Sequence, residues 1–258
     1  MFFIPGNKMN RAKRPKREKR DRIPILPNLF TTGNLFCGFF SLISAIEGQY
    51  LRAGVAILVA IIFDILDGRV ARYTRTTSRF GLEYDSLCDL VSFGVAPAVL
   101  IYTFALKSYG RYGWLAAFLY VATAALRLAK FNVQTLKEKT YFSGIPSPGA
   151  AGLLASTVLF SHWYGLSSPV KHVAILVMVY IISYLMVSGI PYFSFKKLDF
   201  AEKHPFYSLV VFVLLLTVVA AEPPVTLFVG FLLYALSGPF LLALRARRGQ
   251  RVVVSSQA

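Results

Sequence analysis

The sequence predicts an all-α membrane protein, a polytopic helical bundle with about eight transmembrane helices in a single domain. Of its 258 residues, 56% are hydrophobic and 16% are charged, and the mean hydropathy is +0.58. Soluble domains carry about 25% charged residues and a smaller apolar share. Long apolar runs recur along most of the chain, and helices are the structures that such runs form in a bilayer.

The first four expected spans follow one another closely in the N-terminal half. Each is an apolar run of at least the roughly 17 residues that a spanning helix needs. A basic turn near residue 76 separates the second from the third and makes these two helices antiparallel neighbours. The four spans are 28–47, 52–75, 81–105 and 112–133.

The last four expected spans each begin at a turn signal that contains proline. The seventh is shorter than the others, and a Glu-Pro-Pro turn leads from it into the eighth. The turn signals are Gly144-Ile145-Pro146, Ser168-Pro169, His204-Pro205 and Glu222-Pro223-Pro224. The spans that follow them are 147–164, 169–190, 206–221 and 225–244.

The basic residues predict the orientation of these spans. With eight spans, 24 of the 28 Lys and Arg residues fall on one side, which the positive-inside rule makes cytoplasmic. We therefore expect a multi-pass protein of the inner (cytoplasmic) membrane with both termini in the cytoplasm. Residues 1–27 form a basic cytoplasmic segment, and residues 246–258 form a cytoplasmic tail.

The net charge of +16 does not indicate a nucleic-acid partner. Nine Lys and Arg residues lie between residues 8 and 22, with no aromatic residue among them for base stacking. A basic run directly before a membrane segment is typical of attraction to anionic lipid headgroups. The two cysteines, Cys37 and Cys88, lie in apolar segments, so neither a disulfide framework nor a cysteine metal site is expected.

The aspartates carry the strongest functional signal. Four of the six in the chain are Asp64, Asp67, Asp85 and Asp89, within segments that are otherwise apolar enough to cross a bilayer. Ionisable groups at that depth are expensive, which makes them a functional-site hypothesis by default. Four close carboxylates repel one another unless cations are bound between them. A single such Asp could instead serve a proton relay or pair helices, but the group of four favours a divalent metal site.

Helical geometry brings these four residues together. Asp67 lies about 60° around the helix from Asp64, and Asp89 about 40° from Asp85, so each pair shares a face. The turn near residue 76 sets Asp67 level with Asp85 and Asp64 level with Asp89. All four are expected to point into one polar hollow open to the cytoplasm. Hard oxygen ligands of this kind suit Mg²⁺ or Mn²⁺ completed by substrate phosphates.

Small residues accompany the carboxylates on the same faces. Gly68 and Ala71 fall within about 40° of Asp64, and Gly81 lies one turn before Asp85. Such positions let a bulky ligand approach the backbone, although each alone is explained as well by helix packing. Arg72 adds positive charge beside them.

At these residues the chain resembles the CDP-alcohol phosphotransferase family. The signature of that family is D-x2-D-G-x2-A-R-x8-G-x3-D-x3-D, and residues 64–89 match it at every fixed position and gap. Other segments are similar to its serine-using branch, the CDP-diacylglycerol–serine O-phosphatidyltransferases. They are Leu26-Pro27-Asn28-Leu29-Phe30-Thr31 with Gly33-Asn34-Leu35-Phe36-Cys37-Gly38, Asp89-Leu90-Val91-Ser92-Phe93-Gly94-Val95-Ala96-Pro97-Ala98, Leu126-Arg127-Leu128-Ala129-Lys130-Phe131-Asn132-Val133, and Phe142-Ser143-Gly144-Ile145-Pro146-Ser147-Pro148.

The resemblance implies an enzyme that transfers the phosphatidyl group of CDP-diacylglycerol to L-serine with two divalent cations. It implies a six-helix core over residues 28–190, two additional helices over 191–245, and a homodimer. In the family pattern the four aspartates hold the metals, and Asp89 is also the general base. Residues at the positions that contact the CDP-lipid are Asn28, Thr31, Gly68, Ala71, Arg72, Ser78 and Gly81.

The acceptor site is less defined by the sequence. Arg127 and Lys130 are the candidates for binding the serine carboxylate, although positive-inside bias alone also accounts for them. The motif binds the CDP-lipid donor and does not identify the acceptor. Glycerol phosphate, inositol phosphate and choline therefore remain alternative acceptors. A divalent-cation transporter is the alternative from another class, since carboxylates between helices can also line an ion path.

Overall fold

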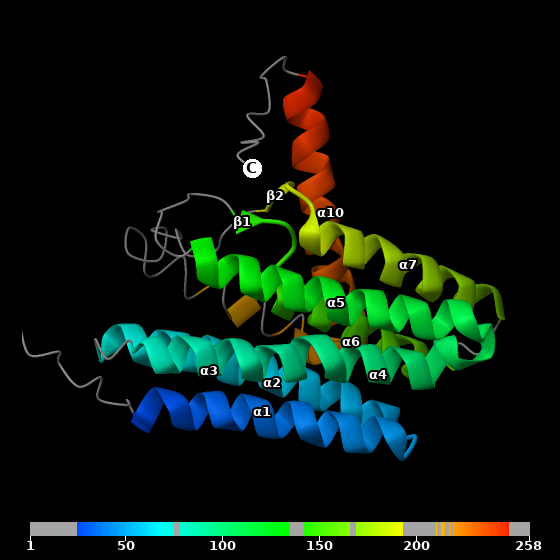
Figure 1. Ribbon diagram of the computed structural model, residues 1–258. Helices are drawn as coiled ribbons and strands as arrows, with labels where there is room; N and C mark the ends of the chain where they lie inside the picture. The colour runs from blue at the N-terminus through cyan, green and yellow to red at the C-terminus, as the bar shows by residue number, and fades with distance from the viewer. Residues whose placement is uncertain are drawn as a thin grey trace, which may run out of the picture.

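A computed structural model describes residues 25–74, 78–134, 142–165, 169–192 and 219–247, with isolated residues between 210 and 217. Most of these residues are helical, and several long helices run side by side in a bundle (Figure 1). The long helices are α1 (Ile25–Ile46), α2 (Tyr50–Tyr73), α5 (Arg111–Gln134), α6 (Ser147–Trp163), α7 (Pro169–Val187) and α10 (Pro223–Arg247).

The expected third span is one helical rod with changes of pitch along it. It runs through α3 (Arg79–Asp89), the π-helical turn η1 (Leu90–Val95), α4 (Ala96–Ile101), a second π-helical turn η2 (Tyr102–Leu106) and the short 3₁₀ turn η3 (Lys107–Tyr109). The sequence predicted the span but not these turns. The first of them follows Asp89 directly, and π turns inside helices are frequent at functional sites.

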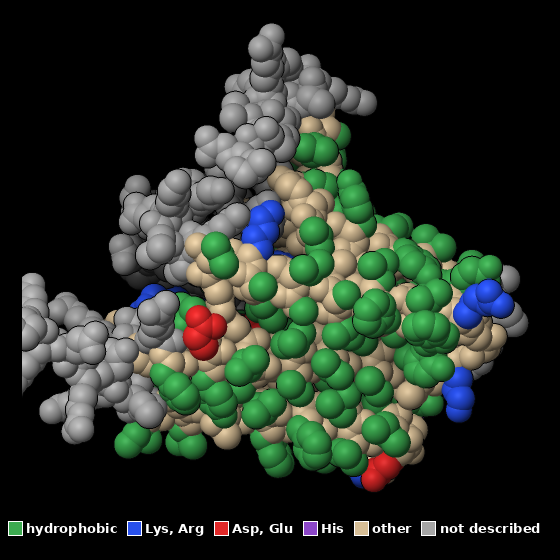
Figure 2. Space-filling view, viewed as in Figure 1, with side chains coloured by type: hydrophobic (Ala, Val, Ile, Leu, Met, Phe, Trp, Pro, Cys, Tyr) green, Lys and Arg blue, Asp and Glu red, His purple; other side chains and the backbone are tan. Residues whose placement is uncertain are grey.

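The described helices fit a multi-pass membrane protein. Four of them are long and apolar enough to cross a bilayer: Ile25–Ile46, Phe80–Tyr109, Arg111–Val133 and Pro223–Ala243. The second expected span forms α2, whose apolar character is interrupted by charged residues near its end. Figure 2 shows hydrophobic side chains over most of the visible face, with charged side chains mainly toward the two ends of the bundle. Phe36, Phe118 and Leu126, each more than 60% exposed, are part of this lipid-compatible surface.

Helices are present at seven of the eight expected positions, within a few residues of the expected bounds. The expected span over 206–221 falls largely outside the described residues, as do the basic segment before Ile25 and the tail after Arg247. In Figure 1 the C-terminal half of α10 rises across the direction of α1 and α5, an arrangement the sequence did not indicate. Pro239 lies inside this helix.

Small residues let the helices pack closely. The buried core is rich in alanine, and α1 meets η1 at Gly38. A methyl group on Gly38 would lie 2.7 Å from the Cα atom of Ser92, so no larger residue fits there without moving the backbone. Small residues at membrane helix contacts serve this purpose generally. The contact fixes α1 against the segment that follows Asp89.

A short antiparallel pairing closes one end of the bundle. β1 (Phe142–Ser143) pairs with β2 (Pro191–Tyr192), and Gly144, with φ of 82°, turns the chain from β1 toward α6. The hydroxyl of Tyr192 donates to the carbonyl of Ala235 in α10 at 3.0 Å. This pairing ties α6, the end of α7 and α10 together.

The first π turn depends on a side chain from α5. Pro97, four residues after Phe93, has no N–H to donate to the Phe93 carbonyl. The hydroxyl of Tyr120, a fully buried residue, donates to that carbonyl at 3.0 Å. One tyrosine of α5 therefore supports the distorted backbone that follows Asp89.

We expect Tyr120→Phe to lower the free energy of unfolding by about 1–3 kcal/mol, because it leaves a buried carbonyl without this donor. Thermal unfolding in detergent, followed by circular dichroism, measures the loss. Tyr112→Phe, at an exposed tyrosine of the same helix, is the control and should change little. Equal stability of the two variants would contradict the role given to the Tyr120 hydroxyl.

Candidate active site and metal centre

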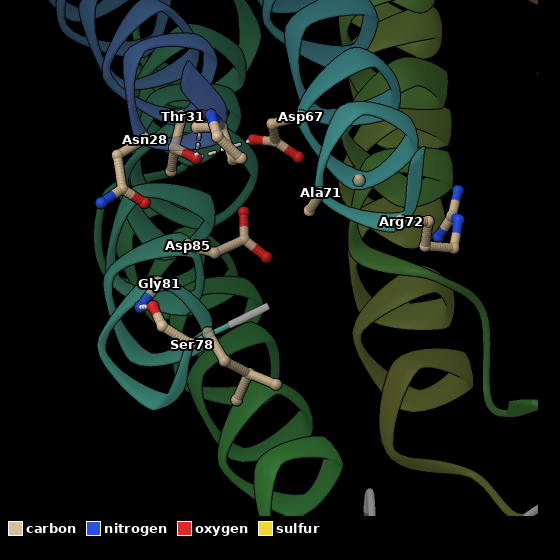
Figure 3. Close-up of a pocket in the computed structure, with 11 residues that line it drawn as sticks. Asn28, Thr31, Asp67, Ala71, Arg72, Ser78, Gly81 and Asp85 are labelled. Atoms are coloured by element: carbon tan, nitrogen blue, oxygen red, sulfur yellow. Dashed lines mark hydrogen bonds between the residues drawn. The ribbon is translucent and has the colours of Figure 1, made fainter. Parts of the chain in front are cut away.

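Three of the four predicted carboxylates gather where α2 ends and α3 begins. Asp64 and Asp67 project from α2 and Asp85 from α3, and one carboxylate oxygen of each lies within 4.8 Å of the others. Figure 3 shows the Asp67 and Asp85 carboxylates pointing toward each other across the gap between the two helices. The hairpin that the sequence predicted therefore brings Asp64, Asp67 and Asp85 into one acidic triad.

The triad could bind a metal ion. Its members are mostly withdrawn from solvent, and Oδ1 of Asp85 is buried without a hydrogen-bond partner among the described residues. Three carboxylates at this spacing repel one another when they are charged, and a bound cation removes that cost. Carboxylate oxygens are also the ligands that hard divalent cations prefer. The donor set and the unpartnered oxygen both fit such an ion.

A cavity of about 210 Å³ opens beside the triad. It lies between the start of α1, the end of α2 and the start of α3, and Asp67 and Asp85 form part of its wall. All seven residues predicted to contact the CDP-lipid line it: Asn28, Thr31, Gly68, Ala71, Arg72, Ser78 and Gly81. Pro27 and Leu82 complete the lining and were not predicted.

Local backbone features shape one wall of this cavity. Ser78 is the N-cap of α3, and its Oγ accepts a hydrogen bond from the N–H of Gly81 at 3.0 Å. A methyl group on Gly81 would lie 3.2 Å from that Oγ and 3.4 Å from Oδ1 of Asn28. Glycine at this position therefore keeps the cavity open between α1 and α3, as the helical spacing suggested.

Arg72 lies at the edge of the cavity. It lines the cavity and is exposed, but its guanidinium points away from the Asp67 and Asp85 carboxylates in Figure 3. Its nearest approach on this side is to Gly68, whose Cα would place a methyl group 3.7 Å from Nη1. The positive charge is thus at the rim of the cavity, where it can meet an anionic ligand entering from outside.

Thr31 has a contact that the sequence did not indicate. Its hydroxyl donates to Oδ2 of Asp67 at 3.0 Å and also lies 3.2 Å from the carbonyl of Pro27. The residue therefore lines the cavity and at the same time orients a member of the triad. Partners that orient metal-binding carboxylates in this way affect metal sites strongly.

Asp89 stands apart from the triad. It is 8% exposed, one helical turn beyond Asp85 on α3, and outside the group of three. Its Oδ1 accepts a hydrogen bond from Nδ2 of Asn34, on α1, at 2.9 Å. The fourth carboxylate is therefore buried near the other three but held by a different helix.

The two predicted acceptor-site cations differ in their surroundings. Arg127 is half-buried on α5, and its Nη1 donates to Oγ of Ser147, at the start of α6, at 2.8 Å. Its Nε is buried without a hydrogen-bond partner in the described part of the chain. Lys130, one turn further along α5, is exposed.

Sequence reasoning gave no site role to several residues that support this region from other helices. Asn34 and Ser147 contact predicted site residues directly, and the ring of Tyr234 in α10 lies over Gly149, in the first turn of α6. Asn132, near the end of α5, accepts from Ser86 and donates to Glu83, which ties α5 to α3. A buried polar residue in an apolar helix is a signal for Asn34, but nothing in the sequence pairs it with Asp89.

A multi-pass helical bundle with an acidic triad beside a cavity defines a membrane-embedded protein that can bind a metal and an anionic ligand together. The CDP-alcohol phosphatidyltransferase family model matches residues 24–190, more than half of the chain. The chain belongs to this family and is a transferase.

Several relatives of known name are similar to most of this chain. A CDP-diacylglycerol–serine O-phosphatidyltransferase of Helicobacter pylori is 38% identical over 214 residues, which cover 82% of this chain and 90% of that protein. A protein of the same name from Bacillus subtilis is 36% identical over 172 residues, 67% of this chain and 92% of that protein. An archaetidylserine synthase of Methanothermobacter thermautotrophicus is 39% identical over 170 residues, 65% of this chain and 69% of that protein.

Proposed function

We propose that this protein transfers the phosphatidyl group of CDP-diacylglycerol to the hydroxyl of L-serine, giving phosphatidylserine and CMP. The observation that carries the proposal is the position of the acidic triad at a cavity lined by all seven predicted CDP-lipid residues. The relatives compared above are named for a serine product or acceptor.

The donor binds with its pyrophosphate at the cavity beside α2 and α3. Gly68, Ala71 and Gly81 leave room for it, and Asn28 and Ser78 offer polar groups on the wall. Arg72 at the rim adds a cation that can meet a phosphate. The acyl chains extend into the apolar surroundings of the bundle, so the donor enters from the membrane.

Two divalent cations, Mg²⁺ or Mn²⁺, are the proposed cofactors. Asp64, Asp67 and Asp85 would hold them; Asp89, a fourth ligand in the family pattern, lies outside this group of three. When bound, such ions offset the negative charge that develops on the pyrophosphate during transfer. Thr31 keeps the Asp67 carboxylate oriented for this purpose.

The transfer itself requires one proton to leave the serine hydroxyl. The hydroxyl oxygen attacks the phosphorus that carries diacylglycerol, a new P–O bond forms, and the bond to CMP breaks. Asp89 accepts the proton, because serine is a poor nucleophile at neutral pH without a positioned base. Most of the remaining rate enhancement comes from positioning and charge stabilisation.

Arg127 is the residue proposed to bind the serine carboxylate. Ser147 holds one side of the guanidinium, and Nε remains as a buried donor for an anionic partner. Lys130 stays the second candidate, but its exposure suits a solvated cation better.

The cellular setting completes the proposal. We infer that the protein is a homodimer in the inner (cytoplasmic) membrane. Both termini and the site face the cytoplasm. The start of α1, the end of α2, the start of α3 and the end of α5 lie at one end of the bundle in Figure 1, which supports a single basic side. Residues 28–190 act as the catalytic core, and 191–245 add helices to it.

Purified protein in mixed micelles with CDP-diacylglycerol, Mn²⁺ or Mg²⁺ and labelled serine tests this function. We expect release of CMP and formation of labelled phosphatidylserine, both abolished by a chelator. CMP release with glycerol phosphate, inositol phosphate or choline, but not serine, would change the acceptor. Absence of CMP release with every alcohol would overturn the phosphotransferase assignment and favour ion transport.

We expect Arg127→Ala to raise the KM for serine about 10- to 100-fold, since a charged hydrogen bond to a carboxylate contributes roughly 1.5–3 kcal/mol. The KM for CDP-diacylglycerol should change much less. Steady-state kinetics in micelles measures both, and Lys107→Ala, an exposed cation at the far end of the bundle, is the control. A larger rise in the serine KM for Lys130→Ala would move the carboxylate site to Lys130.

A further inference from the structure

One face of α1 contacts two of the acidic side chains. Thr31 and Asn34 are three residues apart and both are buried. The Thr31 hydroxyl donates to Oδ2 of Asp67 on α2, and the Asn34 amide donates to Oδ1 of Asp89 on α3. Residues at this spacing lie side by side on a helix. The first helix therefore provides a donor to each of the two helices that carry the carboxylates.

Asn34 is itself held tightly. It is fully buried, and its backbone carbonyl accepts a hydrogen bond from Oγ of Ser92 at 3.0 Å. One turn later, Gly38 allows the backbone of α1 to approach Ser92 closely. Both contacts are at Ser92, three residues after Asp89, and they hold α1 against the segment that carries this carboxylate.

Holding one oxygen of Asp89 has a chemical consequence. The 2.9 Å bond occupies Oδ1 and fixes the plane in which the carboxylate lies. Oδ2 then becomes the oxygen presented to other groups. Asp64, Asp67 and Asp85 form a group that does not include Asp89. A donor that orients an acceptor in this way fixes the geometry of a reacting group.

We infer that Asn34 is a positioning residue for Asp89: it separates this carboxylate from the metal-binding triad and presents Oδ2 to the acceptor hydroxyl. This inference rests on the proposed transfer reaction and on Asp89 as its base. It adds a functional residue from α1 that lies outside the aspartate motif. It also divides the four carboxylates into three that gather and one that is held separately.

The test compares Asn34→Ala with Ser41→Ala. Ser41 lies on the same face of α1 two turns later, is fully buried, and donates to the carbonyl of Ala53 at 2.9 Å. Both substitutions remove one buried hydrogen bond of α1, but only the first removes a donor to a carboxylate. The readouts are kcat, the KM of each substrate, the Mn²⁺ concentration for half-maximal activity, and thermal unfolding.

For Asn34→Ala we expect kcat to fall about 10- to 100-fold, the range for loss of an orienting partner. The KM values and the half-saturating Mn²⁺ should stay within about threefold, because donor and metal contacts are elsewhere. Ser41→Ala should keep its kcat even where its stability falls. Asn34→Asp, which keeps the shape and replaces the donor by an acceptor, should lose at least as much kcat as Asn34→Ala.

Two results would overturn the inference while the proposed function stands. One is wild-type kcat in Asn34→Ala or Asn34→Asp. The other is an equal fall of kcat in Ser41→Ala, which would mean that α1 packing alone is responsible. If Asn34→Ala does not fold, the isosteric Asn34→Asp decides the question. A wild-type protein that releases no CMP with any acceptor would instead remove the proposed function itself.

Discussion

Asp89→Asn is expected to lower turnover with serine by about 10²- to 10⁴-fold, the range that general base catalysis contributes. The amide has nearly the same shape as the carboxylate but cannot take the proton of the acceptor hydroxyl. Asp89 does not line the cavity beside the triad, so binding of CDP-diacylglycerol should remain largely intact. The prediction therefore separates chemistry from donor binding.

Two measurements on the same preparation check it. Labelled serine incorporation gives kcat, and the shift in thermal unfolding with added CDP-diacylglycerol reports binding of the donor. Glu83→Gln, an exposed acid on the same helix, is the matched control and should keep most of the activity. Normal turnover in Asp89→Asn would exclude Asp89 as the base, whatever its effect on binding.

The sequence was sufficient for most of the fold because membrane helices are specified locally. Each apolar run of adequate length forms a helix that satisfies its own backbone, so the positions of α1, α5 and α6 could be predicted to within a few residues. The π turns of the third span could not. The first of them is supported by the Tyr120 hydroxyl, which comes from α5 and reaches the Phe93 carbonyl only after the helices have packed.

The acidic triad could be predicted for a related reason. Asp64 and Asp67 lie on one helix and Asp85 on the next, and a short turn between antiparallel helices fixes their relative height. Helical period and one hairpin are enough to bring them together. The same reasoning placed Asp89 level with Asp64, but the structure holds Asp89 outside the triad.

Asp89 has its hydrogen-bond partner on a third helix, α1. Neither the helical period nor a short turn determines how α1 is rotated about its axis relative to α3. The Asn34–Asp89 hydrogen bond could therefore not be predicted from the local sequence. Gly38 is the residue that makes this contact geometrically feasible, and in the sequence it resembles any other small residue of a membrane helix. The Arg127–Ser147 hydrogen bond between α5 and α6 could not be predicted from the sequence for the same reason.

Repulsion between the gathered carboxylates lowers the stability of the folded protein when no cation is bound. Asp67 and Asp85 face each other across the helix gap, and the Thr31 hydroxyl donates a hydrogen bond to Asp67. Without a cation, like charges at this spacing destabilise the folded state. A bound cation stabilises the same state in proportion to its affinity. Stability and metal binding should therefore respond in opposite directions to the loss of one acidic group.

Asp67→Asn is the variant in which these opposite responses should be largest. We expect the metal concentration for half-maximal activity to rise about tenfold or more, and maximal activity to fall, because one anionic ligand of a buried triad is lost. In a chelator, however, the variant should unfold at the same temperature as the wild type or higher, since one repelling charge is gone. Added Mn²⁺ should then stabilise the wild type more than the variant.

Thermal unfolding with chelator and across a Mn²⁺ series, beside the metal titration of activity, measures both responses. Glu47→Gln, an exposed acid at the end of α1 remote from the triad, is the control and should leave both curves unchanged. An Asp67→Asn protein with an unaltered metal titration would show that this carboxylate is not a ligand. Lower stability in chelator would show that loss of the hydrogen bond from Thr31 outweighs the relief of repulsion.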